Sequence, residues 1–84
     1  MAKIDIYTTN YCPYCKKAKA LLEQLGYDFN EIDITENEDS VIDKLYETTG
    51  RNTVPQIFIN DNFIGGADDL FDLRSSGALT ELLK

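Results

Sequence analysis

The clearest pattern of apolar positions lies between residues 12 and 25. Four apolar side chains there follow the spacing i, i+3, i+4 and i+7: Ala18, Leu21, Leu22 and Leu25. This spacing places all four on one face of an α-helix. Gly26 follows directly, at the position where a glycine commonly ends a helix. The pattern therefore predicts an amphipathic helix over residues 12–25.

Short runs of apolar and β-branched residues predict the strands. Residues 3–7 alternate polar and apolar side chains, and residues 29–34 form a second, shorter run. Residues 56–59 and 63–64 are separated by Asn60-Asp61-Asn62, whose residue types favour a tight turn. These last two runs therefore predict a β-hairpin.

A second helical stripe follows the second predicted strand. It stops at Gly50 and consists of Val41, Ile42, Leu45 and Tyr46. Thr35 and Glu38, three residues apart ahead of the stripe, match a capping box, in which two side chains satisfy free N–H groups at a helix start. The sequence therefore predicts a helix that begins near Thr35.

The C-terminal part predicts a third helix. Gly65-Gly66 interrupts the strand pattern, and Asp68 is expected to cap a helix that continues through Leu73. Residues 79–83 predict one last short helical segment.

The predicted elements follow the order β-α-β-α-β-β-α, which is typical of an α/β fold. A strand, a helix and a second strand at the start predict a parallel pair joined by a crossover. The hairpin adds antiparallel strands, so the expected architecture is a four-stranded mixed sheet flanked by helices. A chain of 84 residues supports one modest core, and residues 1–84 are interpreted as a single domain.

Composition excludes several classes of partner. The net charge is −7 and there is no histidine, which opposes binding to nucleic acid or to an anionic membrane surface. No apolar run approaches the roughly 20 residues needed to cross a bilayer. The N-terminal residues read as a strand rather than a signal peptide, so a cytoplasmic location is expected.

The two cysteines, Cys12 and Cys15, are three positions apart. A bridge between them closes so small a loop that it stabilises the fold little. Pro13 suits the first position of the predicted helix, which leaves Cys12 at the N-cap, where free N–H groups and the helix dipole favour an anion. Cys12 is therefore predicted to be the acidic, attacking thiol, and Cys15, one turn further in, the more buried resolving thiol.

The cysteine pair has two other interpretations. The cysteines can be inert small residues at a helix start, although a Cys-x-x-Cys beside a βαβ pattern is more often redox active. They can also form half of a zinc site. Zinc needs four ligands and the rest of the chain holds no cysteine or histidine, so only a dimer would complete it.

Four short blocks give the sequence a resemblance to a known family. In chain order they are Tyr-Cys-Pro-Tyr-Cys at 11–15, Thr53-Val54-Pro55, Gly65-Gly66 and Asp68-Asp69. At these separations, over essentially the whole length, the chain resembles the glutaredoxins of the small bacterial dithiol type. The resemblance implies a thioredoxin-like fold, with glutathione as substrate and reductant and no tightly bound cofactor or metal.

The resemblance also implies which residues bind glutathione: Tyr14, Arg51, Thr53, Val54, Pro55, Gly66, Ala67 and Asp68. The Val54–Pro55 peptide bond is expected to be cis, and the Val54 backbone is expected to pair with glutathione as a short added strand. N–H groups of Ala67 and Asp68 would bind the γ-glutamyl carboxylate, the Asp68 carboxylate the ammonium, and Arg51 the glycyl carboxylate. Asp69 is interpreted as a solvated charge in the first helical turn.

Thr9 departs from the family pattern, because many glutaredoxins have a lysine there. The loss of that charge predicts a less acidic Cys12, or weaker glutathione binding, than in a lysine-bearing relative. Arg51 and the lysines at 16, 17 and 19 are expected to compensate in part.

The predicted function is reduction of glutathione mixed disulfides and protein disulfides through Cys12 and Cys15. The expected partners are glutathione and disulfide-bearing or glutathionylated proteins, and the protein is expected to be a monomer.

Two alternative functions remain open. One is an iron–sulfur cluster carrier, in which two chains and two glutathiones supply the ligands. The other is a thioredoxin-like donor that a reductase recharges.

Overall fold

A computed structural model describes residues 2–83 of the chain. Its strands are β1 (Ile4–Thr8), β2 (Asn30–Asp33), β3 (Gln56–Ile59) and β4 (Asn62–Gly65). Its helices are α1 (Pro13–Gln24), α2 (Glu38–Thr49), α3 (Ala67–Ser76) and α4 (Ala78–Leu82), and one 3-10 turn, η1 (Thr35–Asn37), precedes α2.

The four strands form one mixed sheet in the order β2-β1-β3-β4. β1 pairs in parallel with β2 and antiparallel with β3, and β3 pairs antiparallel with β4. Asn60 and Asp61 join β3 to β4 with φ of 52° and 68°, the left-handed conformation that a two-residue hairpin turn requires. The structure thus confirms the predicted four-stranded mixed sheet flanked by helices.

The hydrophobic core lies on one face of the sheet, under α1, α3 and α4. Alternate residues of β1 and β3 meet apolar residues of these helices: Ile4, Ile6, Ala18, Leu21, Leu22, Ile57, Ile59, Ala67, Leu70 and Leu79. On the opposite face Tyr7 and Phe58 meet edge to face at 5.8 Å. The period of two along each strand therefore separates an aliphatic core from an aromatic face.

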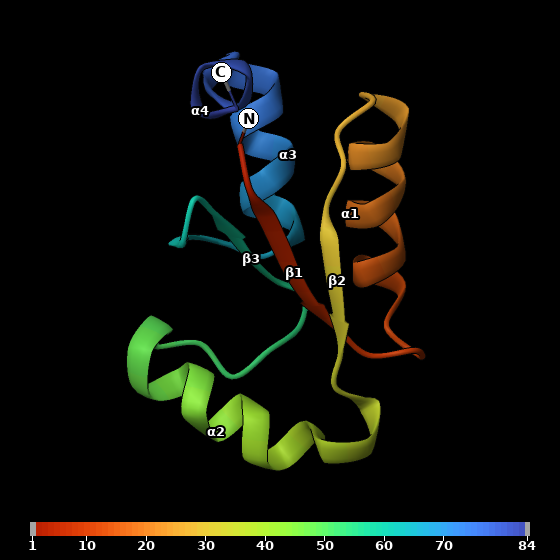
Figure 1. The fold of residues 1–84 in the computed structure, drawn as a ribbon, viewed down its shortest axis with the longest axis vertical. Coiled ribbons are helices and arrows are strands. Elements are labelled where there is room, and N and C mark those ends of the chain that lie inside the picture. The colour runs from red at the N-terminus through yellow and green to blue at the C-terminus, as the bar shows by residue number, and fades with distance from the viewer. Residues whose placement is uncertain (1, 84) are drawn as a thin grey trace.

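α2 stands apart from this core. It lies across the ends of β1 and β2 (Figure 1), and none of its residues is buried. Individual polar contacts connect it to the rest of the chain. The Tyr11 hydroxyl donates a hydrogen bond to Glu38 at its start, and the Thr49 hydroxyl donates to Gln56 Oε1 at 3.0 Å at its end.

The predicted capping box of α2 is wrong. Thr35 lies in the 3-10 turn, and the N-cap of α2 is Asn37, which makes no side-chain capping bond. The N–H and hydroxyl of Thr35 both donate to Asp33 Oδ1, at 2.9 and 2.5 Å. Asp33 thus binds the groups that a capping box would have used, because a short acidic side chain readily bonds backbone two residues on.

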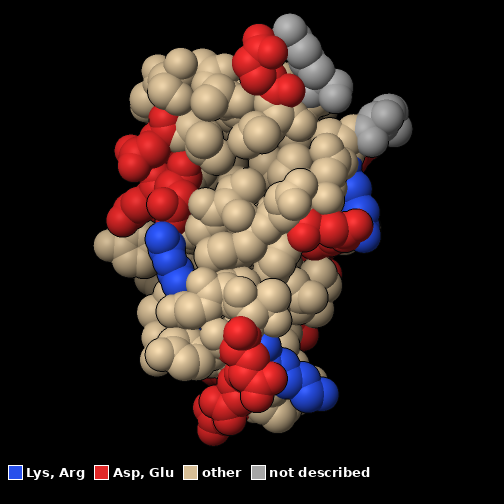
Figure 2. Space-filling model, turned by 90° about the vertical axis from the view of Figure 1, so that its left-hand side faces the viewer, with Lys and Arg blue, Asp and Glu red and all other residues tan. Residues whose placement is uncertain are grey.

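Charged side chains are unevenly spread over the surface. On the face shown in Figure 2, acidic and basic side chains lie mainly around the rim and uncharged residues fill the middle. Within residues 2–83, no helix has both the length and the apolar content needed to span a membrane.

The packing of α1 on the sheet predicts the result of a core truncation. Leu22 is fully buried, so Leu22→Ala should lower the free energy of unfolding by about 2–5 kcal/mol through lost contacts and a residual cavity. Leu82→Ala, at a position that is 41% exposed, should cost less than about 1 kcal/mol. Urea unfolding of the reduced protein measures both, and equal losses would contradict this assignment of the core.

Candidate active site

Cys12 is the N-cap of α1, as the sequence predicted. Its backbone is extended (φ −90°, ψ 114°), and Pro13 begins the helix. The Cys12 sulfur accepts a hydrogen bond from the backbone N–H of Cys15 at 3.1 Å. A free N–H at a helix start and the positive end of the helix dipole both favour a negative charge on this sulfur.

The Cys12 thiol also faces the segment that precedes β3. Its Sγ lies 3.7 Å from the Val54 carbonyl oxygen, to which the thiol donates. The side chain is 7% exposed, and both cysteines are reduced. Cys12 therefore lies between the start of α1 and the backbone of Val54, and the Val54–Pro55 peptide bond is cis, as expected.

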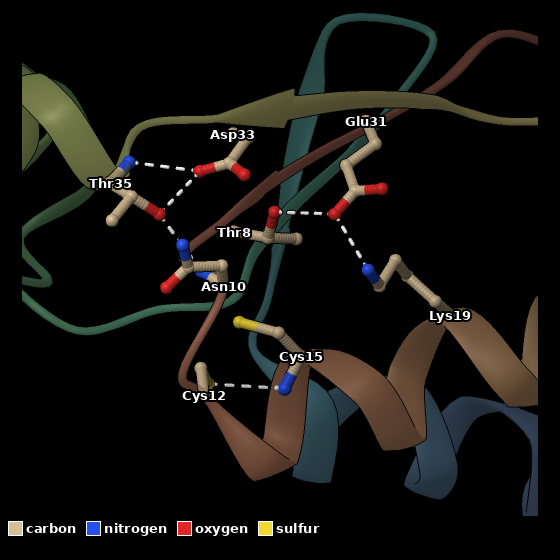
Figure 3. A network of polar contacts seen from close by, with 8 residues as sticks. All are labelled: Thr8, Asn10, Cys12, Cys15, Lys19, Glu31, Asp33 and Thr35. Carbon is tan, nitrogen blue, oxygen red and sulfur yellow. Dashed lines mark hydrogen bonds and ion pairs between the residues drawn. The ribbon is translucent and has the colours of Figure 1, made fainter.

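Cys15 differs sharply from Cys12 in its environment. It is completely buried, one helical turn further along α1 (Figure 3). Burial, and then its hydrogen bond to Cys12, raises the pKa of the Cys15 thiol to about 12. Cys15 is therefore protonated at neutral pH, and its complete burial agrees with the prediction that it is the more buried of the two thiols.

A groove of about 260 Å³ lies beside Cys12. Nine residues line it: Tyr14, Arg51, Thr53, Val54, Pro55, Gly66, Ala67, Asp68 and Asp69. All eight residues predicted to bind glutathione are among them. They come from α1, from the segment between α2 and β3, and from the start of α3, so the fold brings together residues that are far apart in the sequence.

The α3 end of the groove differs from the prediction in its capping. The N-cap is Gly66, and Asp68 lies inside the first turn, so Asp68 does not cap the helix. Asp69 does: its Oδ2 accepts the Gly66 N–H at 2.9 Å, because a carboxylate at the third helical position reaches back to the N-cap.

Asp69 also holds a basic residue at the groove. Its Oδ2 lies 2.7 Å from Nη1 of Arg51, and the guanidinium stacks over Phe63 at 5.8 Å. The ion pair with Arg51, followed by the Gly66 N–H, holds the pKa of Asp69 below its usual range. The interpretation of Asp69 as a merely solvated charge is therefore wrong.

Gln56 is a buried polar residue that sequence reasoning missed. It is 1% exposed, and its Nε2 donates to the Arg51 carbonyl at 2.7 Å while its Oε1 accepts from Thr49. These bonds fix the segment that carries Arg51 and Thr53. The signal for this role in the sequence is a single amide side chain, that of Gln56, at the start of an otherwise apolar strand.

Thr9 directly follows β1, at the start of the segment that leads to Cys12. It is buried, and its carbonyl accepts the Cys12 N–H at 3.4 Å. Its effect on Cys12 and on glutathione binding, compared with the lysine of other family members, stays a prediction.

A reduced cysteine pair at a helix N-terminus, on a thioredoxin-like sheet and beside a groove, defines the class of thiol–disulfide oxidoreductases. Within that class the comparisons identify the family. The glutaredoxin family model matches residues 4–64, so the chain belongs to the glutaredoxin family.

Relatives from several organisms support this assignment. Glutaredoxin 3 of Escherichia coli strain K12 is 48% identical over 84 residues, which cover all of both chains. The solution structure of a glutaredoxin from Brucella melitensis is 48% identical with a TM-score of 0.87, covering 100% of this chain and 90% of that one. The crystal structure of a buckwheat glutaredoxin–glutathione complex is 32% identical with a TM-score of 0.91, covering 95% and 74%.

The burial of Cys15 predicts its chemical reactivity. In the Cys12→Ser variant, Cys15 should react with iodoacetamide at neutral pH at least about tenfold more slowly than in the unfolded chain. Burial is the largest cause of its raised pKa and persists in this variant, whereas the contributions of Cys12 are lost. Mass spectrometry measures the rate, and the same variant unfolded in urea is the control. Equal rates for folded and unfolded protein would contradict the assignment.

The contact between Gly65 and Asp69 predicts a substitution effect at the groove. Gly65 has φ of +124°, and a Cβ there would lie 2.2 Å from Asp69 Oδ2. Gly77 has φ of +84° with nothing within 4 Å, so Gly77→Ala meets only the conformational cost of about 1–2 kcal/mol. Gly65→Ala should lower the free energy of unfolding by at least about 1 kcal/mol more than Gly77→Ala does, because it also displaces Asp69. Urea unfolding compares the two variants, and equal losses would contradict this account.

Proposed function

We propose that this protein reduces glutathione mixed disulfides, with Cys12 as the nucleophile and glutathione as the reductant. The observation that carries the proposal is that Cys12 adjoins the groove: its sulfur lies 3.7 Å from the carbonyl oxygen of Val54, a residue that lines the groove. A peptide bound there would have its own sulfur next to the thiol that attacks it.

The groove offers a partner for each polar end of glutathione. The backbone of Val54 is suited to pair with the extended tripeptide. The first N–H groups of α3, at Ala67 and Asp68, suit the γ-glutamyl carboxylate, and the Asp68 side chain suits the neighbouring ammonium. Arg51 suits the glycyl carboxylate, since a guanidinium has five donors and Asp69 engages only part of them. The crystal structure of a buckwheat relative in complex with glutathione supports glutathione as the ligand.

The reaction on a glutathionylated protein has two steps. The Cys12 thiolate attacks the glutathionyl sulfur, a Cys12–glutathione disulfide forms, and the protein thiolate leaves and takes up a proton. The thiolate of a second glutathione then attacks the glutathionyl sulfur of this disulfide, releases Cys12 as a thiolate and forms glutathione disulfide. Because the helix N-terminus favours the anion on Cys12, it favours departure of Cys12 in the second step.

For protein disulfides we propose a route that also uses Cys15. Cys12 opens the target disulfide and binds one of its sulfurs. Cys15 then attacks Cys12, so that a Cys12–Cys15 disulfide forms and the target is released fully reduced. Glutathione subsequently reduces the Cys12–Cys15 pair.

The reaction consumes reduced glutathione, which agrees with action in the cytoplasm. The groove and both cysteines belong to a single chain, which supports action as a monomer. The membership in the glutaredoxin family does not favour either a cluster carrier or a reductase-dependent donor.

Single-cysteine variants test the proposed function. Cys15→Ser should retain turnover of a glutathione mixed disulfide with glutathione as reductant, because both steps use only Cys12. Cys12→Ser should fall to the uncatalysed rate, because Cys15 is buried and protonated. Coupled glutathione-reductase turnover measures both variants, with a glutathionylated peptide as substrate.

Substantial turnover by Cys12→Ser, or loss of turnover in a folded Cys15→Ser protein, would refute the roles assigned here. A wild-type protein that is recharged by a thioredoxin reductase and not by glutathione would refute the choice of reductant.

A further inference from the structure

Three polar residues form a network behind Cys15 that the proposed reaction does not use. Lys19 Nζ lies 2.7 Å from Glu31 Oε2, and the Thr8 hydroxyl donates to the same oxygen at 2.7 Å (Figure 3). The network joins α1, β2 and β1. Thr8 is fully buried, whereas the Lys19 and Glu31 side chains are 25% and 36% exposed, so this ion pair lies near the surface and solvent screens it in part.

Lys19 follows Cys15 by four residues on α1, which places the two side chains on the same side of the helix. In Figure 3 both extend from α1 toward the sheet. Burial and the contact with Cys12 raise the pKa of Cys15, whereas a hydrogen bond with the Thr9 backbone and, after it, the positive charge of Lys19 lower this pKa. The hydrogen bond that Lys19 donates to Glu31 raises the pKa of Lys19 and keeps it charged.

The need for such a cation arises when the target is bound to Cys12. Cys15 must then lose a proton in a buried site, and a buried anion without a partner is costly. Cys12 is covalently engaged and carries no charge at that stage. A hydrogen bond with the Thr9 backbone also favours the Cys15 thiolate, but Thr8 and Thr9 carry no charge, and Glu31 and Asp33 on β2 are negative. Lys19 is therefore the cation among these neighbours that can stabilise the new thiolate.

We propose that Lys19 is a positioning residue for the resolving step, whose ammonium stabilises the Cys15 thiolate, and that Glu31 restrains this effect by its opposite charge. The inference rests on the Cys15 route proposed above. In this step the Cys15 proton passes to solvent, the Cys15–Cys12 bond forms and the Cys12–target bond breaks. The cysteine pair is oxidised by two electrons, and the target sulfur leaves as a thiolate that takes up a proton.

The two charges predict effects of opposite sign. Lys19→Met should slow the resolving step, by about threefold for each unit by which the pKa of Cys15 rises, because thiolate falls tenfold while nucleophilicity rises about threefold. Lys19→Arg should restore the rate. Glu31→Gln keeps an oxygen for Lys19 and Thr8 but removes the charge, so it should speed the step.

Stopped-flow reaction with Ellman's reagent measures this step separately. Attack by Cys12 releases one equivalent of the coloured thiolate in a phase that depends on reagent concentration. Attack by Cys15 on Cys12 releases the second equivalent in a phase whose rate is independent of reagent concentration. Lys44→Met, an exposed lysine on α2, is the matched control for net charge and should leave the second phase unchanged.

The two phases distinguish failure of this inference from failure of the proposed function. A first phase absent from the wild-type protein would refute Cys12 as nucleophile. Two results with a normal first phase would overturn the role of Lys19. One is a second phase in Lys19→Met that is as fast as in the wild-type protein. The other is a second phase in Lys19→Arg that is as slow as in Lys19→Met. A slower second phase in Glu31→Gln would overturn the electrostatic role of Glu31.

Discussion

The site depends on one constraint: Cys12 is the N-cap of α1, at the end of the short segment that follows the strand β1. The start of a helix leaves N–H groups that need an acceptor, and the Cys12 sulfur accepts one of them from Cys15 at 3.1 Å. The same geometry sends Cys15 one turn into the protein, where it is completely buried. A single helix start therefore makes two chemically different thiols from two identical residues, without any histidine in the chain.

A second helix start completes the arrangement. α3 begins at the far side of the groove, and Asp69 binds both its N-cap and Arg51 from the segment before β3. Gln56 holds that segment from within the sheet. The groove thus lies between two helix N-termini, which suits an anionic peptide even though the protein carries a net charge of −7. For binding an anionic peptide in this groove, the two helix dipoles and the oriented guanidinium of Arg51 matter more than the net charge of the protein.

The sequence predicted the sheet and α1 closely, because apolar periodicity and Gly26 report on local structure and burial. The eight residues that the family resemblance implied all line one groove, whereas their spacing in the sequence alone does not bring them together. The errors concern polar side chains with more than one available partner. Thr35 bonds Asp33 instead of capping α2, and Asp69 rather than Asp68 caps α3. Gln56 and Asp69 act through residues distant in sequence, and such pairings become visible only in the folded chain.

The central claim is that the groove and Cys12 form one glutathione site. Amide hydrogen exchange in the Cys15→Ser variant, before and after a single glutathione is attached to Cys12, tests it most directly. The account predicts slower exchange at Val54, Ala67 and Asp68, because these N–H groups gain partners in the bound peptide, and unchanged exchange in α2. Unchanged exchange at all three positions, with glutathione covalently attached, would contradict the claim.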